Sequence, residues 1–275
     1  MRKGLSLISY KKQLNGKTAG NRRFLYGKTG QSLAIYRKNC YNTLMSIYAI
    51  SDLHLSLTSD KPMDIFGVGW EGHFEKIKSD WKSKVQPEDI VLISGDISWA
   101  MKMSDALVDL NALADLPGKK VFIRGNHDYW WNGITRLRDS APNDSFVFLQ
   151  TDAVKLGEFV FIGSRGWTCP GSNDYTEQDQ KLYLREAQRF RLAFLDADKL
   201  AEEGDKKVVL MHFPPFTAKQ EDTLFSKLFE ENKVDKVVFG HIHGAAYFPL
   251  KTFKSGIEYV LASCDKVGFN LVKIY

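Results

Sequence analysis

Cysteines and long apolar runs are scarce in this sequence, and acidic side chains are missing from its first 44 residues. The three cysteines, Cys40, Cys169 and Cys264, are widely spaced and form no C-x-x-C pair, which disfavours a disulfide framework or a zinc knuckle. No segment approaches the roughly 18 to 20 apolar residues of a membrane helix, and the N-terminus lacks the apolar region of a secretory signal. We therefore expect a cytoplasmic protein without a membrane partner.

The absence of acidic residues distinguishes positions 1–44 from the rest of the chain. This segment holds ten of the 38 basic residues and none of the 33 acidic ones, which leaves residues 45–275 with 28 basic residues, 33 acidic residues and a formal charge of −5. Strand-like sequence begins directly after Met45. We expect 1–44 to be a basic extension that is disordered or an artefact of an upstream start. A basic arm for nucleic acid or anionic lipid, or a targeting peptide, is the alternative.

The remaining chain has the pattern of an α/β protein. With 44% apolar and 13% aromatic residues it can form a substantial core. Short β-branched runs alternate with amphipathic helical stretches, an order typical of sheets covered by helices. We expect 45–275 to be one domain with two sheets packed face to face and helices outside. Strands are expected at 46–51, 89–94, 119–124, 145–150, 153–164 (a hairpin), 206–211, 235–240, 245–253, 257–263 and 269–275, and helices at 70–85, 104–116, 176–203 and 221–231.

Polar residues gather directly after five of the expected strands, where open α/β sheets bind their ligands. These motifs are SDLH at 51–54, SGD at 94–96, RGNHD at 124–128, MHFPP at 211–215 and GHIHG at 240–244. They contain five of the six histidines, which favours a metal site; the sixth, His73, is expected to be structural. Asp52 and His54 are two residues apart, as are His241 and His243, and in an extended chain this spacing points both side chains to one face.

The residue types indicate which ions such a site would bind. Carboxylate oxygens combined with imidazole nitrogens suit Mn, Fe or Zn better than Ca or Mg. Two ions roughly 3.5 to 4 Å apart need a bridging carboxylate, and Asp96 is the natural candidate. Asn126 would coordinate through its carbonyl oxygen without adding a negative charge. Because Asp52 and Asp96 supply only two negative charges, the centre would stay positive and could hold hydroxide and phosphate together. We predict two divalent metal ions.

The motifs DLH, GD, GNHD, H before FPP and GHIH, in this order, resemble the five signature blocks of the calcineurin-like metallophosphoesterases, including the small bacterial-type enzymes. The similarity runs from about Ile47 to His243. It implies a four-layer αββα sandwich of two mixed sheets with a dinuclear centre. The implied ligands are Asp52, His54 and His243 for one ion, Asn126, His212 and His241 for the other, and Asp96 for both. His127 would be the catalytic histidine that stabilises the transition state or protonates the leaving oxygen.

One block departs from the phosphoprotein phosphatases of this superfamily, whose second block reads GDxxDRG. Here the sequence reads GDISWAM, with Trp99 where that Asp would stand. The block therefore lacks the carboxylate near the catalytic histidine and the arginine that binds phosphate. The orienting partner of His127 stays open, since Asp128 is its neighbour in sequence but need not be in function. A phosphoprotein phosphatase is disfavoured.

Aromatic and basic residues near the motifs are candidates for substrate contacts. Trp99, Trp130 and Trp131 follow metal motifs directly, and Arg165 and Trp167 lie in the segment SRGWTCP. The rings could stack on a base or another planar group while Arg165 binds a phosphate oxygen. Core aromatics and an ion pair are the alternatives. The expected substrate contacts are Arg165, Trp99, Trp130 and Trp167.

The leading interpretation is a phosphoesterase in which a hydroxide that bridges two metal ions attacks phosphorus. A phosphodiester is the preferred substrate and a small phosphomonoester the alternative, because the arginine arrangement of the protein phosphatases is missing. The rivals are an inactive protein-binding scaffold of the same fold and a nuclease on polymeric nucleic acid. Intact ligand motifs disfavour the scaffold, and the lack of an evident basic track in 45–275 disfavours the nuclease. We expect a small phosphorylated or nucleotide-like partner and predict no oligomeric state.

Overall fold

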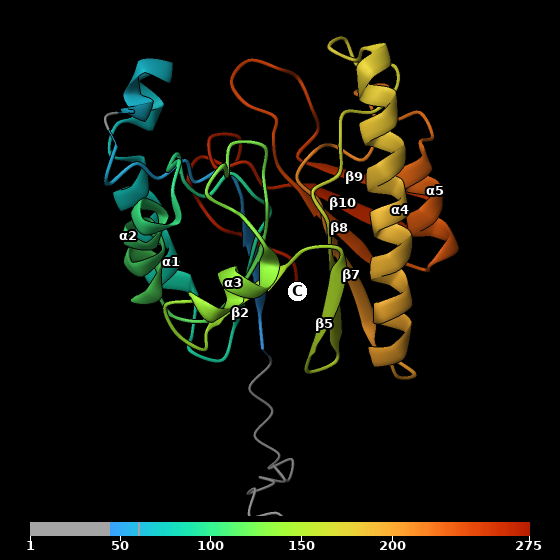
Figure 1. Cartoon of the computed structure of the whole chain (residues 1–275), viewed down its shortest axis with the longest axis horizontal. Helices are drawn as coiled ribbons and strands as arrows, with labels where there is room; N and C mark the ends of the chain where they lie inside the picture. Colours follow the sequence, from blue (N-terminus) through green and yellow to red (C-terminus); the bar gives the residue numbers. More distant parts are fainter. Residues whose placement is uncertain (1–44, 60) are drawn as a thin grey trace, which may run out of the picture. The chain divides into compact units, whose positions relative to one another are not determined.

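Two mixed β-sheets with helices on their outer faces form the centre of the described chain (Figure 1). The computed structural model describes residues 45–59 and 61–275, so the prediction for the basic segment 1–44 lies outside the described residues. The order of layers is helix, sheet, sheet, helix. The predicted αββα sandwich is confirmed.

The first sheet contains five strands in the order β11–β1–β2–β3–β4. Their bounds are β1 (Ile47–Ile50), β2 (Ile90–Ile93), β3 (Lys119–Ile123), β4 (Phe146–Leu149) and β11 (Val272–Lys273). Strands β1 to β4 are parallel, and β11 pairs antiparallel with β1. Because parallel strands end at the same edge, the loops after β1, β2 and β3 emerge next to one another.

The second sheet contains six strands in the order β5–β6–β7–β8–β10–β9. Their bounds are β5 (Asp152–Leu156), β6 (Phe159–Gly163), β7 (Lys206–Leu210), β8 (Lys236–Phe239), β9 (Lys251–Lys254) and β10 (Ile257–Leu261). Strands β6, β7, β8 and β10 are parallel, while β5 and β9 are antiparallel edge strands. The predicted hairpin is β5–β6, with Gly157 at a φ of 64° in its turn.

The helices divide between the two outer faces (Figure 1). Their bounds are α1 (His73–Lys84), α2 (Met103–Ala114), α3 (Ile134–Asp139), α4 (Glu177–Leu200) and α5 (Leu224–Glu231). Side chains such as Ile77 of α1 and Leu110 of α2 pack on the first sheet, and Phe190 of α4 and Phe225 of α5 pack on the second. Within the described residues, no helix is both long and apolar enough to cross a membrane.

The strand residues alternate between the middle core and the two outer cores, as the two-residue period of a strand requires. Ile90 and Leu92 of β2 face the second sheet, while Val91 and Ile93 face the helices. The second sheet follows the same pattern: Val208 and Leu210 of β7 contribute to the middle core, and Val209 lies under its helices. Both faces of each sheet are therefore buried, which leaves the strand ends as the place for polar chemistry.

Four elements differ from the sequence-based expectations. The expected strand 269–275 forms only at β11, since Phe269 lies in a turn with a left-handed φ of 60°. Helix α1 begins at His73 rather than at 70, because Gly72 adopts a left-handed φ of 58° that separates it from a short 3-10 turn at Val68–Trp70. Of the expected strand 245–253, only β9 forms, since Pro249 has no N–H to donate to a ladder. The short helix α3 was not expected.

Candidate metal centre

All five polar motifs lie at the carboxyl ends of parallel strands from the two sheets. Asp52 and His54 follow β1, Asp96 follows β2, and the GNHD segment follows β3. His212 follows β7, and the two histidines of GHIH follow β8. Since the sheets pack face to face, these loops converge where the two sheet edges meet. The fold therefore brings the five motifs of the sequence together.

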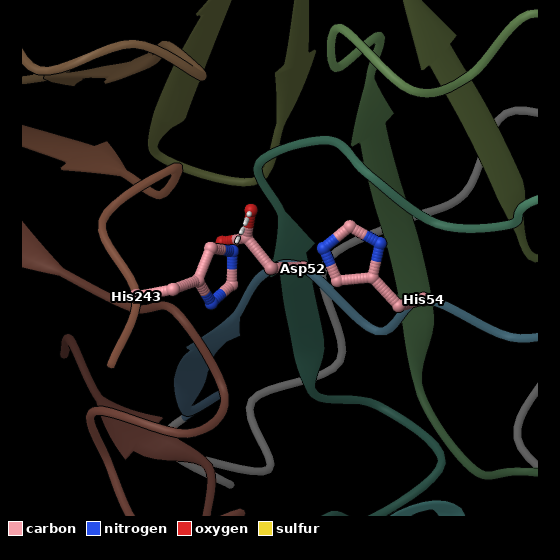
Figure 2. A group of neighbouring side chains, drawn as sticks. All are labelled: Asp52, His54 and His243. Atoms are coloured by element: carbon pink, nitrogen blue, oxygen red, sulfur yellow. Dashed lines mark ion pairs between the residues drawn. The ribbon is translucent and has the colours of Figure 1, made fainter. Parts of the chain in front are cut away.

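Two groups of side chains bring possible donor atoms within 4.8 Å of one another. The first contains Asp52, His54 and His243, which Figure 2 shows near one another and which come from the loop after β1 and the loop after β8. The second contains Asp52, Asp96 and His212. Asp52 belongs to both groups. Asp96 also reaches both, because its Oδ2 lies 3.8 Å from His54 Nε2 and 3.5 Å from His212 Nε2.

Asn126 joins the remaining histidines to this cluster. Its Oδ1 lies 2.7 Å from His212 Nε2 and 3.0 Å from His241 Nδ1. His212 Nδ1 donates a hydrogen bond to the Ser94 carbonyl at 2.9 Å, which in the neutral imidazole leaves Nε2 with a lone pair only. An imidazole lone pair directed at an amide oxygen is an arrangement that a cation between them would stabilise.

The donor atoms therefore fit divalent ions. His54 supports the same conclusion, because its buried Nδ1 has no hydrogen-bond partner among residues 45–59 and 61–275, and a buried polar atom without a partner is costly. Carboxylate, amide and imidazole donors together suit the Mn, Fe and Zn class. The arrangement brings together all seven residues that the sequence analysis predicts as ligands.

The backbone around the donors is strained. Asp52, His54, Asp96 and His241 all have left-handed backbone conformations, with φ angles of 60°, 46°, 51° and 73°. Non-glycine residues rarely adopt this region, at a cost of about 1 to 3 kcal/mol each, and such strain gathers at functional sites. The fold thus holds these four side chains in directions that a relaxed chain would not give them.

Glycines allow the loops to approach the donors closely. A Cβ atom on Gly125 would overlap with Asp96 Oδ1, and one on Gly240 would overlap with Asp52 Oδ2. Gly95, at a φ of 94°, would place a Cβ 2.8 Å from His212 Nδ1. These contacts explain why glycine stands beside the polar residue in three of the five motifs.

Opposite charges lie close together in this cluster and shift the pKa values of its members. Burial would raise the pKa of Asp52, but the contact of His243 Nε2 with Oδ1 at 3.3 Å and the nearby His212 hold it below its ordinary value. Burial and the neighbouring Asp52 raise the pKa of Asp96 to about 8. Burial also lowers the pKa of His54 to about 3. Bound cations would instead favour ionised carboxylates and neutral imidazoles.

Asp265 is a functional residue that the sequence analysis missed. Its Oδ1 accepts a hydrogen bond from His243 Nδ1 at 2.8 Å, and its Oδ2 accepts one from the Gly244 N–H at 2.8 Å. Burial alone would lower the pKa of His243, but its contacts with Asp265 and Asp52 raise it to about 10. A carboxylate behind a ligating histidine orients the ring and increases its basicity. The available signal was that Asp265 closely follows β10, another strand of the same sheet.

Asp128 connects the loops rather than orienting His127. Its buried carboxylate accepts N–H groups from Asp96, Ile97, Ser98 and Gly125, and the indole N–H of Trp130, at 2.7 to 3.2 Å. Burial, with the nearby Asp96, raises the pKa of Asp128 to about 6 against these hydrogen bonds. The loop after β2 is thereby tied to the loop after β3.

His127 lies beside the cluster, half-buried, and its backbone N–H donates to Asp96 Oδ1 at 2.8 Å. Its ring contacts Trp99, with centroids 4.4 Å apart, and Trp99 also stacks on His54 at 4.8 Å. Nδ1 of His127 has no hydrogen-bond partner in the described part of the chain. Trp99 thus lies beside His127. It stands at the sequence position where the GDxxDRG motif of the phosphoprotein phosphatases has its second Asp.

The structure separates the expected substrate contacts. Trp130 has no exposed surface and packs in the core of the first sheet, so the prediction that it contacts substrate is wrong. Trp131 is buried there too. Trp167 is half-buried, and its indole N–H donates to Asp179 at 2.8 Å. Arg165 stacks over the Trp167 ring, with its guanidinium carbon 4.6 Å from the centroid.

Arg165 and His73 lie in different environments. Burial is the main cause that lowers the pKa of Arg165, to about 10, and nearby arginines add to it although Glu186 opposes the shift. His73 has a structural contact, because its Nε2 lies 3.0 Å from the Leu53 carbonyl, to which it donates. The interpretation of His73 as structural agrees with this contact.

Comparisons with known proteins agree with this fold. No curated protein sequence matches the chain. Among solved structures it is similar to TT1561 of Thermus thermophilus, at 13% identity over 84% of this chain and 98% of that one, with a TM-score of 0.53. It is also similar to AQ665 of Aquifex aeolicus, a protein of unknown function, at 15% identity over 83% and 95% of the two chains, with a TM-score of 0.46. At 13% identity, the similarity to TT1561 concerns the fold alone.

The family comparison covers the metal centre itself. The family model described as calcineurin-like phosphoesterase matches residues 45–245, a range that includes every predicted ligand and ends just after the GHIHG motif. Asp265 lies beyond it. The match spans well over half of the sequence, and the chain belongs to the calcineurin-like phosphoesterase family.

Proposed function

We propose that this protein is a metal-dependent hydrolase with a dinuclear centre that cleaves a phosphodiester or, alternatively, a small phosphomonoester. The family supports action on phosphoester bonds. The observation that carries the proposal is the convergence of seven possible donor side chains from five loops, in which the Nε2 of His212 faces the Oδ1 of Asn126 and the buried Nδ1 of His54 has no partner among the described residues.

The proposed ligand sets follow the contacts between the side chains. Asp52, His54 and His243 would hold one ion, and Asn126, His212 and His241 the other, with Asp96 shared between them. Two divalent ions, with manganese the first choice, would supply Lewis acidity and activate water for attack on phosphorus. Asp265 and the Ser94 carbonyl keep the rings of His243 and His212 in the tautomer that presents Nε2.

His127 is the residue proposed to act on the substrate directly. It is half-buried beside Asp96, outside both ligand groups, and its Nδ1 is not used by any described residue. A histidine in this place can donate a hydrogen bond to a phosphoryl or leaving oxygen. Trp99 limits the movement of the ring and supplies no charge.

The preference for a diester rests on the second motif. Trp99 replaces the carboxylate of the protein phosphatases, and the arginine of their extended motif is absent. A small phosphorylated or nucleotide-like substrate is preferred to polymeric nucleic acid, because residues 45–275 hold more acidic than basic residues and present no evident basic track, which a small substrate does not need. The two described cysteines are buried free thiols, which is compatible with the cytoplasmic location that forms part of this proposal.

The first test compares bis-p-nitrophenyl phosphate with p-nitrophenyl phosphate as substrates for the full chain in Mn²⁺. We expect faster hydrolysis of the diester and loss of both metal and activity in Asp96→Asn. A preference for the monoester would redirect the search to small phosphatase substrates. If two ions bind and neither compound is hydrolysed, the inactive scaffold becomes the better interpretation.

A further inference from the structure

A cavity of about 120 Å³ lies next to the metal centre and is lined by Arg124, Arg165, Arg185 and Arg189, together with Ser164 and Gln150. The arginines come from three places in the chain: Arg124 follows β3, Arg165 follows β6, and the other two lie on α4. We refer to this cavity, with its four arginines, as the arginine pocket. The sequence analysis singled out only Arg165.

The arginine pocket contains more positive charge than the described chain neutralises. Arg189 forms an ion pair with the buried Glu186 at 2.6 Å, and Ser164 Oγ donates to the other oxygen of that carboxylate at 3.1 Å. Within residues 45–59 and 61–275, no carboxylate lies within ion-pair distance of the other three arginines. One carboxylate therefore faces four guanidinium groups.

Two of the arginines also have unsatisfied donors. Nε of Arg124 and Nε of Arg165 are buried, and neither has a hydrogen-bond partner in the described structure. On α4, Arg185 and Arg189 are four residues apart, so they lie on one face, where like charges destabilise a helix slightly. Buried donors and repelling charges of one sign are both relieved by an anion.

The backbone connects the arginine pocket to the metal ligands. Arg124 immediately precedes Gly125 and Asn126. The carbonyl of Arg165 accepts the N–H of His212 at 2.9 Å. The segments that carry Arg124 and Arg165 are therefore directly joined to segments that carry predicted ligands, and the arginine pocket and the metal centre are neighbouring sites.

We propose that the arginine pocket binds a second anionic group of the substrate, a phosphate or a carboxylate, while the scissile phosphoester lies at the metal centre. This inference rests on the proposed function and narrows it to substrates with two anionic groups. The cavity, at about 120 Å³, has room for a compact anion. Arginine forks match the oxygen pairs of both phosphate and carboxylate.

The first experiment measures the binding of an anion to the arginine pocket and does not depend on catalysis. Inorganic phosphate is titrated calorimetrically into the full chain after treatment with a chelator. The variant Arg185→Glu places a carboxylate in the pocket at an exposed position, so it is expected to fold. Arg191→Glu is the matched control, because Arg191 is exposed on the same helix but does not line the cavity and carries the same change in charge.

We expect one phosphate to bind per chain, about tenfold to a hundredfold more weakly in Arg185→Glu and within about twofold of wild type in Arg191→Glu, where solvent screens the change. Absence of saturable binding to the wild type, or an equal loss in both variants, would overturn the proposal.

The second experiment identifies the anion. Diesters of p-nitrophenyl phosphate are prepared with an alkanol whose far end is neutral, a carboxylate or a phosphate, in arms of increasing length, and hydrolysed by the Mn²⁺-loaded full chain. We expect kcat/KM to be about tenfold to a hundredfold higher for a charged arm than for the neutral one. The gain should disappear in Arg185→Glu and persist in Arg191→Glu. The better arm distinguishes phosphate from carboxylate.

Each other outcome has a definite meaning. If the neutral diester is hydrolysed as fast as the charged ones, or if Arg185→Glu slows all three equally, the arginine pocket does not hold a second anion and the inference is wrong, although the hydrolase proposal stands. If the loaded protein hydrolyses none of the diesters, the proposed function fails, and the phosphate titration alone decides whether the arginine pocket binds an anion.

Discussion

The two sheets contribute different chemistry to the same centre. The loops after the first sheet carry the carboxylates, the amide, His54 and His127, whereas the loops after β7 and β8 of the second sheet carry only histidines among the predicted ligands. Each sheet is also followed by one carboxylate that is not itself a predicted ligand. Asp128 binds backbone N–H groups of the first sheet's loops, and Asp265 binds the ring of His243 in the second.

This difference shows how the centre is assembled. The negative charge comes from one half of the sandwich and the neutral nitrogen donors come largely from the other, so neither sheet has a complete site before the middle core forms. Asp128 fixes where a loop runs, and Asp265 fixes where a ring points. A change at Asp128 should therefore affect folding, and a change at Asp265 should affect metal binding.

The largest effect is expected for the loss of His127, which should reduce the rate of hydrolysis without reducing metal binding. His127→Ala should lower the rate of diester hydrolysis by about a hundredfold to ten-thousandfold, because the ring is proposed to contact the reacting oxygens. Its metal content should stay at the wild-type level, since it belongs to neither ligand group. The measurements are kcat for the diester and elemental analysis of the purified protein. A full rate in this variant would exclude the proposed role.

The next effect concerns stability. Asp128→Asn should lower the free energy of unfolding by at least about 3 kcal/mol, because an amide group would face five N–H donors with only one oxygen to offer. Urea unfolding of chelator-treated protein measures this without a contribution from bound metal. Asp144→Asn is the control, an exposed position where a change within about 0.5 kcal/mol is expected. Equal midpoints would show that Asp128 does not hold the loops.

In the second sheet, Asp265→Asn should weaken metal binding by about tenfold to a hundredfold while changing stability much less than Asp128→Asn. The amide can still accept from His243 Nδ1 but no longer carries the charge that makes the ring a stronger donor. Competitive titration with a metal-binding dye gives the affinity. A loss of stability as large as that of Asp128→Asn, with unchanged affinity, would contradict the division between the two carboxylates.

The sequence revealed the parts of this centre that are local. Each predicted ligand closely follows a recognisable strand, so the strand pattern and the five motifs together predicted seven side chains that the folded chain brings together. The role of Asp128 stayed open and Asp265 was missed, because partners such as Ile97 and His243 lie 31 and 22 residues away from them in the chain. Local sequence contains no information on such contacts.

The same limit explains the wrong and missing predictions for substrate contacts. The position of Trp130 after GNHD did not reveal that its ring turns into the core of the first sheet. The arginine pocket combines residues from β3, β6 and α4 that are neighbours only in the folded chain. Tertiary packing determines both the burial of Trp130 and the assembly of the arginine pocket. Neither leaves a periodic pattern or a motif in the sequence.

The smallest effect on kcat/KM is expected at Trp99, which contacts both a predicted ligand and the proposed catalytic histidine. Its ring packs against His54 and His127, while its indole N–H donates only to Met63 Sδ at 3.2 Å. Trp99→Phe keeps a ring there and should change kcat/KM by about threefold or less, and Trp99→Ala, which removes the ring, by about tenfold, as expected for aromatic contacts of about 0.5 to 1.5 kcal/mol. Both are measured with the neutral diester. If Trp99→Phe were as slow as Trp99→Ala, the indole itself would contact the substrate, and Trp99 would be a binding residue and not a support for the two histidines.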